Sequence, residues 1–166
     1  MTEIPFARTN KVVVGIDPGA SAGSITALSL TDMELVMSVK MPPDALGMTD
    51  SLKGMRDKLD IFMVFLEQVR GYVPKKSPMS MHSISRLCRH AGVLEGILAA
   101  LGIPYQEIAP NSWHRALKLP KGGNYAERKK AVYSYVKQRY PEDTSQARCD
   151  SIAIAMAGTM KLRGKT

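Results

Sequence analysis

The stretch that most constrains this chain is Lys11–Leu30, KVVVGIDPGASAGSITALSL. Val12–Val14 are β-branched, the residues that follow (GIDPG) end the run and turn the chain, and a second apolar run covers 25–30. This pattern predicts a β-hairpin whose first strand is central in a sheet. Asp17 ends that strand, where an unpaired charge is heavily penalised. Either a metal ion or a hydrogen-bonded phosphate offsets this penalty, or Asp17 only caps the turn.

Length and charge limit the number of domains and the class of partner that this chain can have. With 166 residues, 45% of them hydrophobic, the chain has room for one domain with a full core, which we place at 11–166 after a loose N-terminal arm at 1–10. Residues 1–110 carry 11 Lys/Arg and 11 Asp/Glu, whereas residues 111–166 carry 12 and 4, so the last third holds the whole net charge of +8. A basic third on a neutral core favours nucleic acid as partner over a merely soluble basic surface.

The cysteines and the apolar runs exclude other classes. Cys88 and Cys149 are far apart, which argues against a thiolate zinc site and for a reducing compartment. No apolar run reaches the length of a membrane span, and no signal pattern opens the chain, so we expect no membrane partner.

The rest of the chain alternates between strand and helix patterns. Strands are predicted at 34–41, 60–67 and 104–109, helices at 81–101, from 111 or 112 to 119, at 125–140 and at 147–162, a loop with a short helix at 44–58, and loops at 71–80 and 121–124. Three meandering strands followed by strand, helix, strand and helix predict an α/β fold, a mixed five-stranded sheet flanked by helices.

Three acids stand at the ends of apolar elements: Asp17, Glu67 after the buried strand, and Asp150 near the start of the last helix. Each has an ordinary alternative, since Glu67 can pair with Arg70 and Asp150 can favour the positive N-terminal end of its helix. Together they suit Mg²⁺, which takes carboxylates, water and phosphate. Two such ions can hold both the attacking water and the leaving oxygen when a phosphodiester is hydrolysed.

Five segments carry a family resemblance. They are, in collinear order over about 11–160, GIDPG with Ala27-Leu28, FLEQV, SRLCRHAGVLEGILAALGI, APNSW and ARCDSIAIA. This set resembles the RuvC-like Holliday-junction resolvases of the RNase H-like nuclease superfamily, nearest to the phage and chloroplast branch. The resemblance implies an RNase H-like sheet, a homodimer, a four-way DNA junction as substrate, and two Mg²⁺ or Mn²⁺ ions. It also implies a cytoplasmic or nucleoid-associated protein, in the host cytoplasm if phage-encoded, or in an organelle.

Position by position, the resemblance implies that Asp17, Glu67 and Asp150 are catalytic metal ligands. Many relatives carry a second acid or a histidine about one turn before the last of these, where this chain has Gln146-Ala147. Asp143 lies nearby, but about two helical turns before Asp150. The fourth ligand therefore stays open between water, Gln146 and Asp143.

The resemblance further implies a basic catalytic residue ahead of the last helices, and Lys129 and His114 align nearest to such positions. Lys129 is suited to hold a scissile phosphate as a point charge. His114 is suited to donate or shuttle a proton, although a histidine in a short surface helix is often inert.

DNA contacts are predicted on two rims of the site, because phosphates dominate binding that selects structure rather than sequence. The rims comprise Lys75, Lys76, Arg86 and Arg89 after Glu67, and Lys118, Lys121, Arg128, Lys129 and Lys130 in the basic third. The alternative for 128–130 is a solvated helix face. Tyr72 lies in the loop that the resemblance places at the junction centre, where it either stacks on an unpaired base or packs under its loop.

The helix predicted at 81–101 is the candidate dimer surface, because Gly92 and Gly96 allow close contact, although its apolar stripe can equally cover its own sheet. We predict a Mg²⁺-dependent endodeoxyribonuclease that resolves four-way junctions. The alternatives are an RNase H-like nuclease acting on RNA–DNA hybrids or flaps, an actin-like or sugar-kinase phosphate-binding lobe, and a junction protein that binds without cutting.

Overall fold

The computed structural model describes residues 11–19, 21–71, 79–121, 123–142 and 145–164, and the predicted arm at 1–10 lies outside them. The described elements are, in order, β1 (Lys11–Asp17), β2 (Ser24–Ser29), β3 (Leu35–Lys40), α1 (Ala45–Lys58), β4 (Asp60–Glu67), α2 (Met81–Ala100), β5 (Tyr105–Ile108), α3 (Pro110–Ala116), α4 (Tyr125–Arg139) and α5 (Gln146–Leu162). Within this part of the chain, no helix combines the length and apolarity that a membrane span needs.

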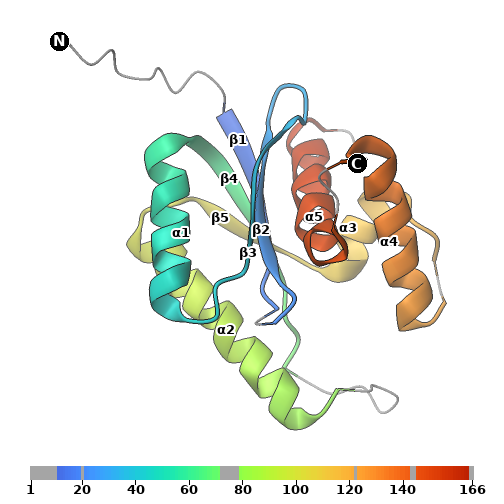
Figure 1. Cartoon of the computed structure of the whole chain (residues 1–166), viewed down its shortest axis with the longest axis horizontal. Coiled ribbons are helices and arrows are strands. Elements are labelled where there is room, and N and C mark those ends of the chain that lie inside the picture. The colour runs from blue at the N-terminus through green and yellow to red at the C-terminus, as the bar shows by residue number, and fades with distance from the viewer. Residues whose placement is uncertain (1–10, 20, 72–78, 122, 143–144, 165–166) are drawn as a thin grey trace.

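The strands form one mixed sheet in the order β3-β2-β1-β4-β5. Strand β1 pairs antiparallel with β2 and parallel with β4, and β4 pairs parallel with β5. The predicted mixed sheet of five strands, with the first strand at its centre, is therefore confirmed. In Figure 1, α1 and α2 lie on one face of the sheet and α3, α4 and α5 lie on the other.

Alternate residues of β1 belong to two separate cores. Val12, Val14 and Ile16 pack with buried residues of α1 and α2, whereas Val13 packs on the opposite face with residues of α3, α4 and α5. Both faces of β1 are therefore dry. This is why its sequence is a continuous apolar run instead of an alternating one.

Helix α5 lies directly on β1 and β2 because the residues at the contact are small. A Cβ at Gly15 would clash with the carbonyl oxygen of Ser151 and would lie 2.5 Å from the backbone nitrogen of Ala155. The hydroxyls of Ser24 and Thr26 on β2 lie 2.6 and 2.7 Å from Ser151 Oγ. These buried contacts hold the first turns of α5 beside the end of β1.

The prediction for 44–58 is correct in placing a helix there but wrong in making it short and part of a loop, since α1 is a continuous helix of 14 residues. Asp44 caps it by accepting a hydrogen bond from the N–H of Gly47 at 2.8 Å. Its buried stripe is Met48, Leu52 and Met55, at helical spacing. The two glycines of this segment suggested a loop, but burial of this stripe outweighs their low helix propensity.

The predicted helix ending at residue 119 is shorter in the structure. Helix α3 starts with Pro110 as its first residue and ends at Ala116. Lys118 then adopts a left-handed conformation with φ 53°, which turns the chain before Leu119 returns to the core.

Candidate active site

The three acids singled out in the sequence lie at one end of the sheet. Asp17 ends β1 and Glu67 ends β4, and the parallel register of the two strands puts them next to each other. Asp150 is in the second turn of α5, beside the serine that is hydrogen-bonded to β2. All three side chains line one cavity.

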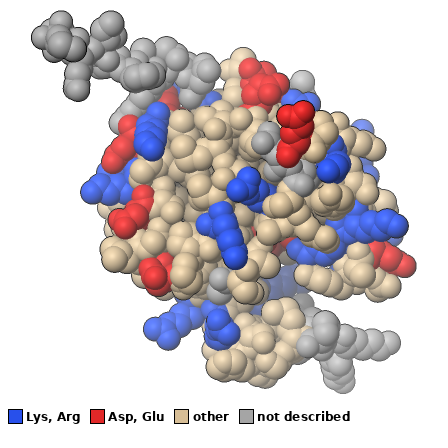
Figure 2. All heavy atoms as spheres, viewed as in Figure 1, with Lys and Arg blue, Asp and Glu red and all other residues tan. Residues whose placement is uncertain are grey.

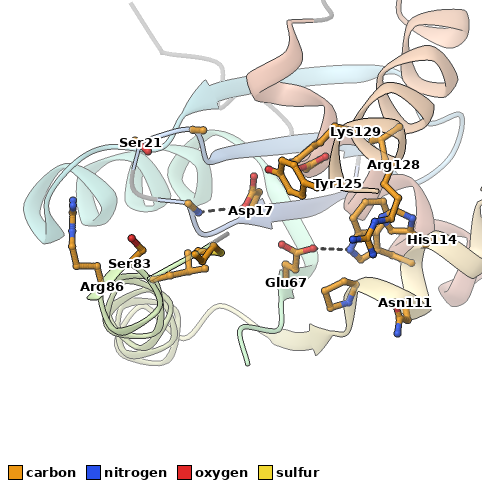
Figure 3. Close-up of a pocket in the computed structure, with 18 residues that line it drawn as sticks. Asp17, Ser21, Glu67, Ser83, Arg86, Asn111, His114, Tyr125, Arg128 and Lys129 are labelled. Atoms are coloured by element: carbon orange, nitrogen blue, oxygen red, sulfur yellow. Dashed lines mark hydrogen bonds and ion pairs between the residues drawn. The ribbon is translucent and has the colours of Figure 1, made fainter. Parts of the chain in front are cut away.

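The cavity has a volume of about 570 Å³ and is bounded by helices on two sides. Figure 3 shows Ser83 and Arg86 of α2 on one side of Asp17 and Glu67, and on the other side His114 of α3 with the cationic side chains of Arg128 and Lys129 of α4. An acidic floor between cationic walls suits a phosphate that approaches together with a metal ion.

Burial opposes the negative charge of the two strand-end acids. Desolvation, followed by the charge of Asp150, raises the pKa of Asp17 to about 6, although Lys129 and the N–H of Gly19 act in the opposite direction. Desolvation and the charge of Asp17 raise the pKa of Glu67 to about 8. Without a bound cation, this end of the sheet therefore retains protons close to neutral pH.

Lys129 of α4 donates to Oδ2 of Asp150 and forms an ion pair with it. Burial by itself lowers the pKa of Lys129. The charge and hydrogen bond of Asp150, together with the charge of Asp17, outweigh burial and raise this pKa above its ordinary value. Its ammonium also lies 5.7 Å from the ring centroid of Tyr125. Lys129 is therefore a permanent positive charge beside two of the three acids.

Helix α3 contributes two rings behind Glu67. Trp113 is buried, and its indole N–H donates to Oε1 of Glu67 at 2.9 Å. The ring of His114 lies 4.0 Å from that of Trp113, centroid to centroid. Desolvation lowers the pKa of His114. The negative charge of Asp150 raises this pKa, and the positive charges of Arg128 and Lys129 lower it further. His114 is thus neutral at physiological pH and able to accept a proton.

The donor set fits a divalent cation. Carboxylate oxygens are the ligands that Mg²⁺ prefers, but desolvation raises the pKa values of Asp17 and Glu67 by more than the nearby charge of Lys129 lowers them. A bound cation would add the positive charge that favours their ionised forms. As the side chains stand, the described residues contain no group of three or more His, Cys, Asp and Glu already arranged for a metal ion, and Asp150 is paired with Lys129 instead.

The predicted DNA-binding residues fall into three groups. Arg86 and Arg128 line the cavity, and Lys121 lines a second hollow of about 390 Å³ next to it, together with His114, Arg115 and Arg128. Arg89, Lys118 and Lys130 are exposed and line neither hollow. Tyr72, Lys75, Lys76 and the candidate ligand Asp143 lie outside the described residues. Figure 2 shows Lys and Arg side chains spread over the visible face, several of them on the side of the molecule that carries α4.

Sequence reasoning missed Trp113. It is the only tryptophan of the chain and directly precedes His114. A single aromatic residue in a short helix is ordinarily a core residue, and Trp113 is indeed buried. Only the placement of α3 against the end of β4 reveals that its N–H reaches a carboxylate.

The sheet order and the helices on its faces define an α/β protein of the RNase H-like fold. Solved structures share this fold, among them two of Thermus thermophilus RuvC. Thermus thermophilus RuvC in complex with a Holliday junction substrate aligns with a TM-score of 0.63 at 19% identity, and a second Thermus thermophilus RuvC structure aligns with a TM-score of 0.62 at 16% identity. Each alignment covers 93% of this chain and 97% of the other. No family model and no curated protein matches the sequence.

Proposed function

We propose that residues 11–166 form a single nuclease domain that resolves Holliday junctions, by divalent-metal-dependent hydrolysis of phosphodiesters. The observation that carries the proposal is the meeting of Asp17, Glu67 and Asp150 at one cavity. The fold supports it, because it is shared with a RuvC structure that contains a Holliday junction substrate. The basic last third of the chain supports a DNA partner.

In this proposal the side chains have separate tasks. Asp17, Glu67 and Asp150 would hold Mg²⁺ or Mn²⁺, and two such ions supply positive charge at the attacking and leaving oxygens of the hydrolysis. Lys129 turns from Asp150 to the scissile phosphate and holds it as a point charge. Neutral His114 accepts a proton, and Trp113 keeps the Glu67 carboxylate oriented.

A homodimer belongs to the same proposal, because a four-way junction presents two symmetric strands for cutting. Helix α2 offers a surface for it. Gly92 and Gly96 are exposed, and nothing in the described chain lies within 4 Å of the positions that their Cβ atoms would take. The close approach that these glycines permit is thus left for a second copy. A cytoplasmic or nucleoid location completes the proposal.

The test is cleavage of a labelled, immobile four-way junction in Mg²⁺, in Mn²⁺ and in EDTA, beside an RNA–DNA hybrid and a flap. We expect paired symmetric cuts in the junction that require the divalent ion. Asp17→Asn should abolish cleavage and leave junction binding in EDTA largely intact, because only a ligand is lost. Substantial cleavage by Asp17→Asn in Mg²⁺ would overturn the assignment. Preferred cutting of the hybrid or the flap would support the general RNase H-like alternative.

One observation favours a second candidate, a protein that binds junctions without cutting them. The ion pair between Lys129 and Asp150 satisfies the third acid without a metal, and no ligand group is preassembled among the described residues. This candidate predicts junction binding in EDTA and no cut strands at any Mg²⁺ or Mn²⁺ concentration, so the same assay separates the two.

A further inference from the structure

His90 is the one polar residue among the buried residues of α2 in the described chain. Its Nδ1 lies 2.6 Å from the carbonyl oxygen of Pro18, in the turn that follows Asp17. A carbonyl oxygen only accepts, so Nδ1 carries the hydrogen and donates it. The other ring nitrogen, Nε2, is buried and has no hydrogen-bond partner among the residues that the structure describes.

This arrangement is costly for a residue that only fills space. A buried nitrogen without a partner destabilises the folded state, whereas an apolar ring at position 90 would occupy similar volume without that cost. What an apolar ring cannot do is donate a hydrogen bond to Pro18. The chemistry of His90 is therefore used at that carbonyl.

The hydrogen bond joins two parts of the candidate site. One turn before His90, Arg86 and Leu87 line the cavity, and one turn after it, Leu94 is buried in the same core as Ile16. Figure 1 shows the N-terminal half of α2 reaching past the end of the sheet. His90 thus ties the turn that directly follows Asp17 to the helix that forms the opposite wall, where that helix leaves the sheet.

Two other hydrogen bonds in this turn close it on itself. The N–H of Gly23 donates to the carbonyl of Gly19 at 2.7 Å, and the N–H of Gly19 donates to Oδ1 of Asp17 at 3.3 Å. Neither bond sets the position of the turn relative to α2. The bond from His90 does so.

We propose that His90 is a positioning residue for Asp17. By holding the Pro18 carbonyl, it fixes the direction from which the Asp17 carboxylate faces the cavity, and it couples that direction to α2. The inference rests on the proposed function, because it assigns His90 a role in cation binding. Removal of a residue that orients a metal ligand ordinarily weakens metal affinity by about 10-fold to 100-fold.

The experiment compares His90→Phe, which keeps a ring but loses the donor, with His90→Asn, whose amide N–H can replace Nδ1–H. His82→Phe is the matched control, since His82 is an exposed histidine of the same helix. Mg²⁺ is titrated against the fluorescence of Trp113, the only tryptophan, which is hydrogen-bonded to Glu67. We expect about 10-fold to 100-fold weaker Mg²⁺ binding in His90→Phe, near-wild-type binding in the other two, and unchanged junction binding in EDTA.

Equal Mg²⁺ affinity in His90→Phe and wild type would overturn the inference, as would equal loss in His90→Asn and His90→Phe, which indicates packing alone. Nitrogen-15 spectra of the unmodified protein test the bond without any variant. The Nδ1–H tautomer of His90 supports the inference, and the Nε2–H tautomer overturns it.

If the wild-type protein bound no Mg²⁺, the proposed function would be refuted. The role of His90 could still be tested by amide hydrogen exchange. The amides of Gly19 and Gly23 should then exchange faster with solvent in His90→Phe and not in His90→Asn. Unchanged exchange in both variants would sink the inference about His90 as well.

Discussion

The indole N–H of Trp113 donates to Oε1 of Glu67 at 2.9 Å, so a residue of α3 orients the acid that ends β4. This hydrogen bond lowers the pKa of Glu67, against desolvation and the charge of Asp17, which together raise it to about 8. Trp113 therefore makes Glu67 easier to ionise. An ionised carboxylate is the form that binds a cation.

Replacing Trp113 with Phe should shift the pH dependence of cleavage. Without the indole N–H the pKa of Glu67 rises further, and the rising limb of the pH–rate profile should move up by about one pH unit. The measurement is the pH–rate profile at a fixed Mg²⁺ concentration.

Leu117→Ala is the matched control for Trp113→Phe, since Leu117 is buried in the same core and its aliphatic side chain has no hydrogen-bond donor to offer an acid. It should lower stability by about 2–5 kcal/mol and leave the pH–rate profile where it is. An equal shift of the pH–rate profile in both variants would mean that destabilisation of the core, and not loss of the hydrogen bond to Glu67, changes the pH dependence.

The stability of the metal-free protein should fall as the pH rises. The pKa of Asp17 is raised from 3.8 to about 6 and that of Glu67 from 4.5 to about 8, so the folded state keeps protons that the unfolded chain has already lost. The free energy of unfolding therefore decreases between about pH 4 and pH 8, as far as these two groups determine it. Thermal unfolding in EDTA across this range measures the effect.

Two variations test the cause of that slope. Glu67→Gln removes the more strongly shifted group and should flatten the upper part of the slope. Added Mg²⁺ should raise the melting temperature more at pH 8 than at pH 5, because it binds the ionised carboxylates. A melting temperature that rises from pH 5 to pH 8 in EDTA, with Glu67→Gln behaving like wild type, would contradict the burial of these charges.

The sheet was predictable because its signals are local. The run Val12–Val14 is apolar on both faces, which only a central strand needs, and Asp17 and Glu67 follow directly where such strands end. Two adjacent parallel strands then bring their last residues together without further information. The acidic floor of the cavity was therefore accessible from the chain alone.

The walls of the cavity were not predictable in the same way. The bond from Trp113 to Glu67 joins residues 46 apart in the chain, and that from His90 to Pro18 joins residues 72 apart. Neither the residue types nor their spacing in the sequence predicts a hydrogen bond between residues so far apart. The length of helix α1 was underestimated for another reason. Gly47 and Gly54 weaken the local helix signal, and the buried stripe of the helix is stabilised only by packing on the sheet.

Gly15→Ala should be strongly destabilising. Its Cβ would clash with the carbonyl of Ser151 and the nitrogen of Ala155, both backbone atoms of α5 that cannot move aside alone. We expect a loss of about 3 kcal/mol in the free energy of unfolding, measured by urea denaturation. Because α5 also carries Asp150, cleavage should fall by more than the population of folded protein does.

Gly54→Ala is the counterpart in α1, where nothing lies within 4 Å of the added Cβ. It should stabilise the protein by about 0.5–1 kcal/mol, because alanine favours the helix over the unfolded chain. If Gly15→Ala were as benign as Gly54→Ala, then α5 would not lie against β1 as closely as the structure has it.

Lys129→Met should separate metal binding from catalysis. Lys129 neutralises Asp150 when no cation is present, so it competes with a cation for that carboxylate. Its removal should therefore tighten Mg²⁺ binding, measured by Trp113 fluorescence. Cleavage under saturating Mg²⁺ should nevertheless fall by about 100-fold to 1,000-fold, because a positive charge near the scissile phosphate is lost.

Lys130→Met removes the neighbouring exposed lysine and is the control for net charge. It should weaken junction binding slightly in low salt and change neither Mg²⁺ affinity nor the rate at saturation, because an exposed charge is screened by solvent and salt. Weaker Mg²⁺ binding in Lys129→Met would mean that Lys129 supports the arrangement of the acids instead of competing for one. Unaltered cleavage in that variant would remove Lys129 from the catalytic set and leave its ion pair with Asp150 as a purely structural contact between α4 and α5.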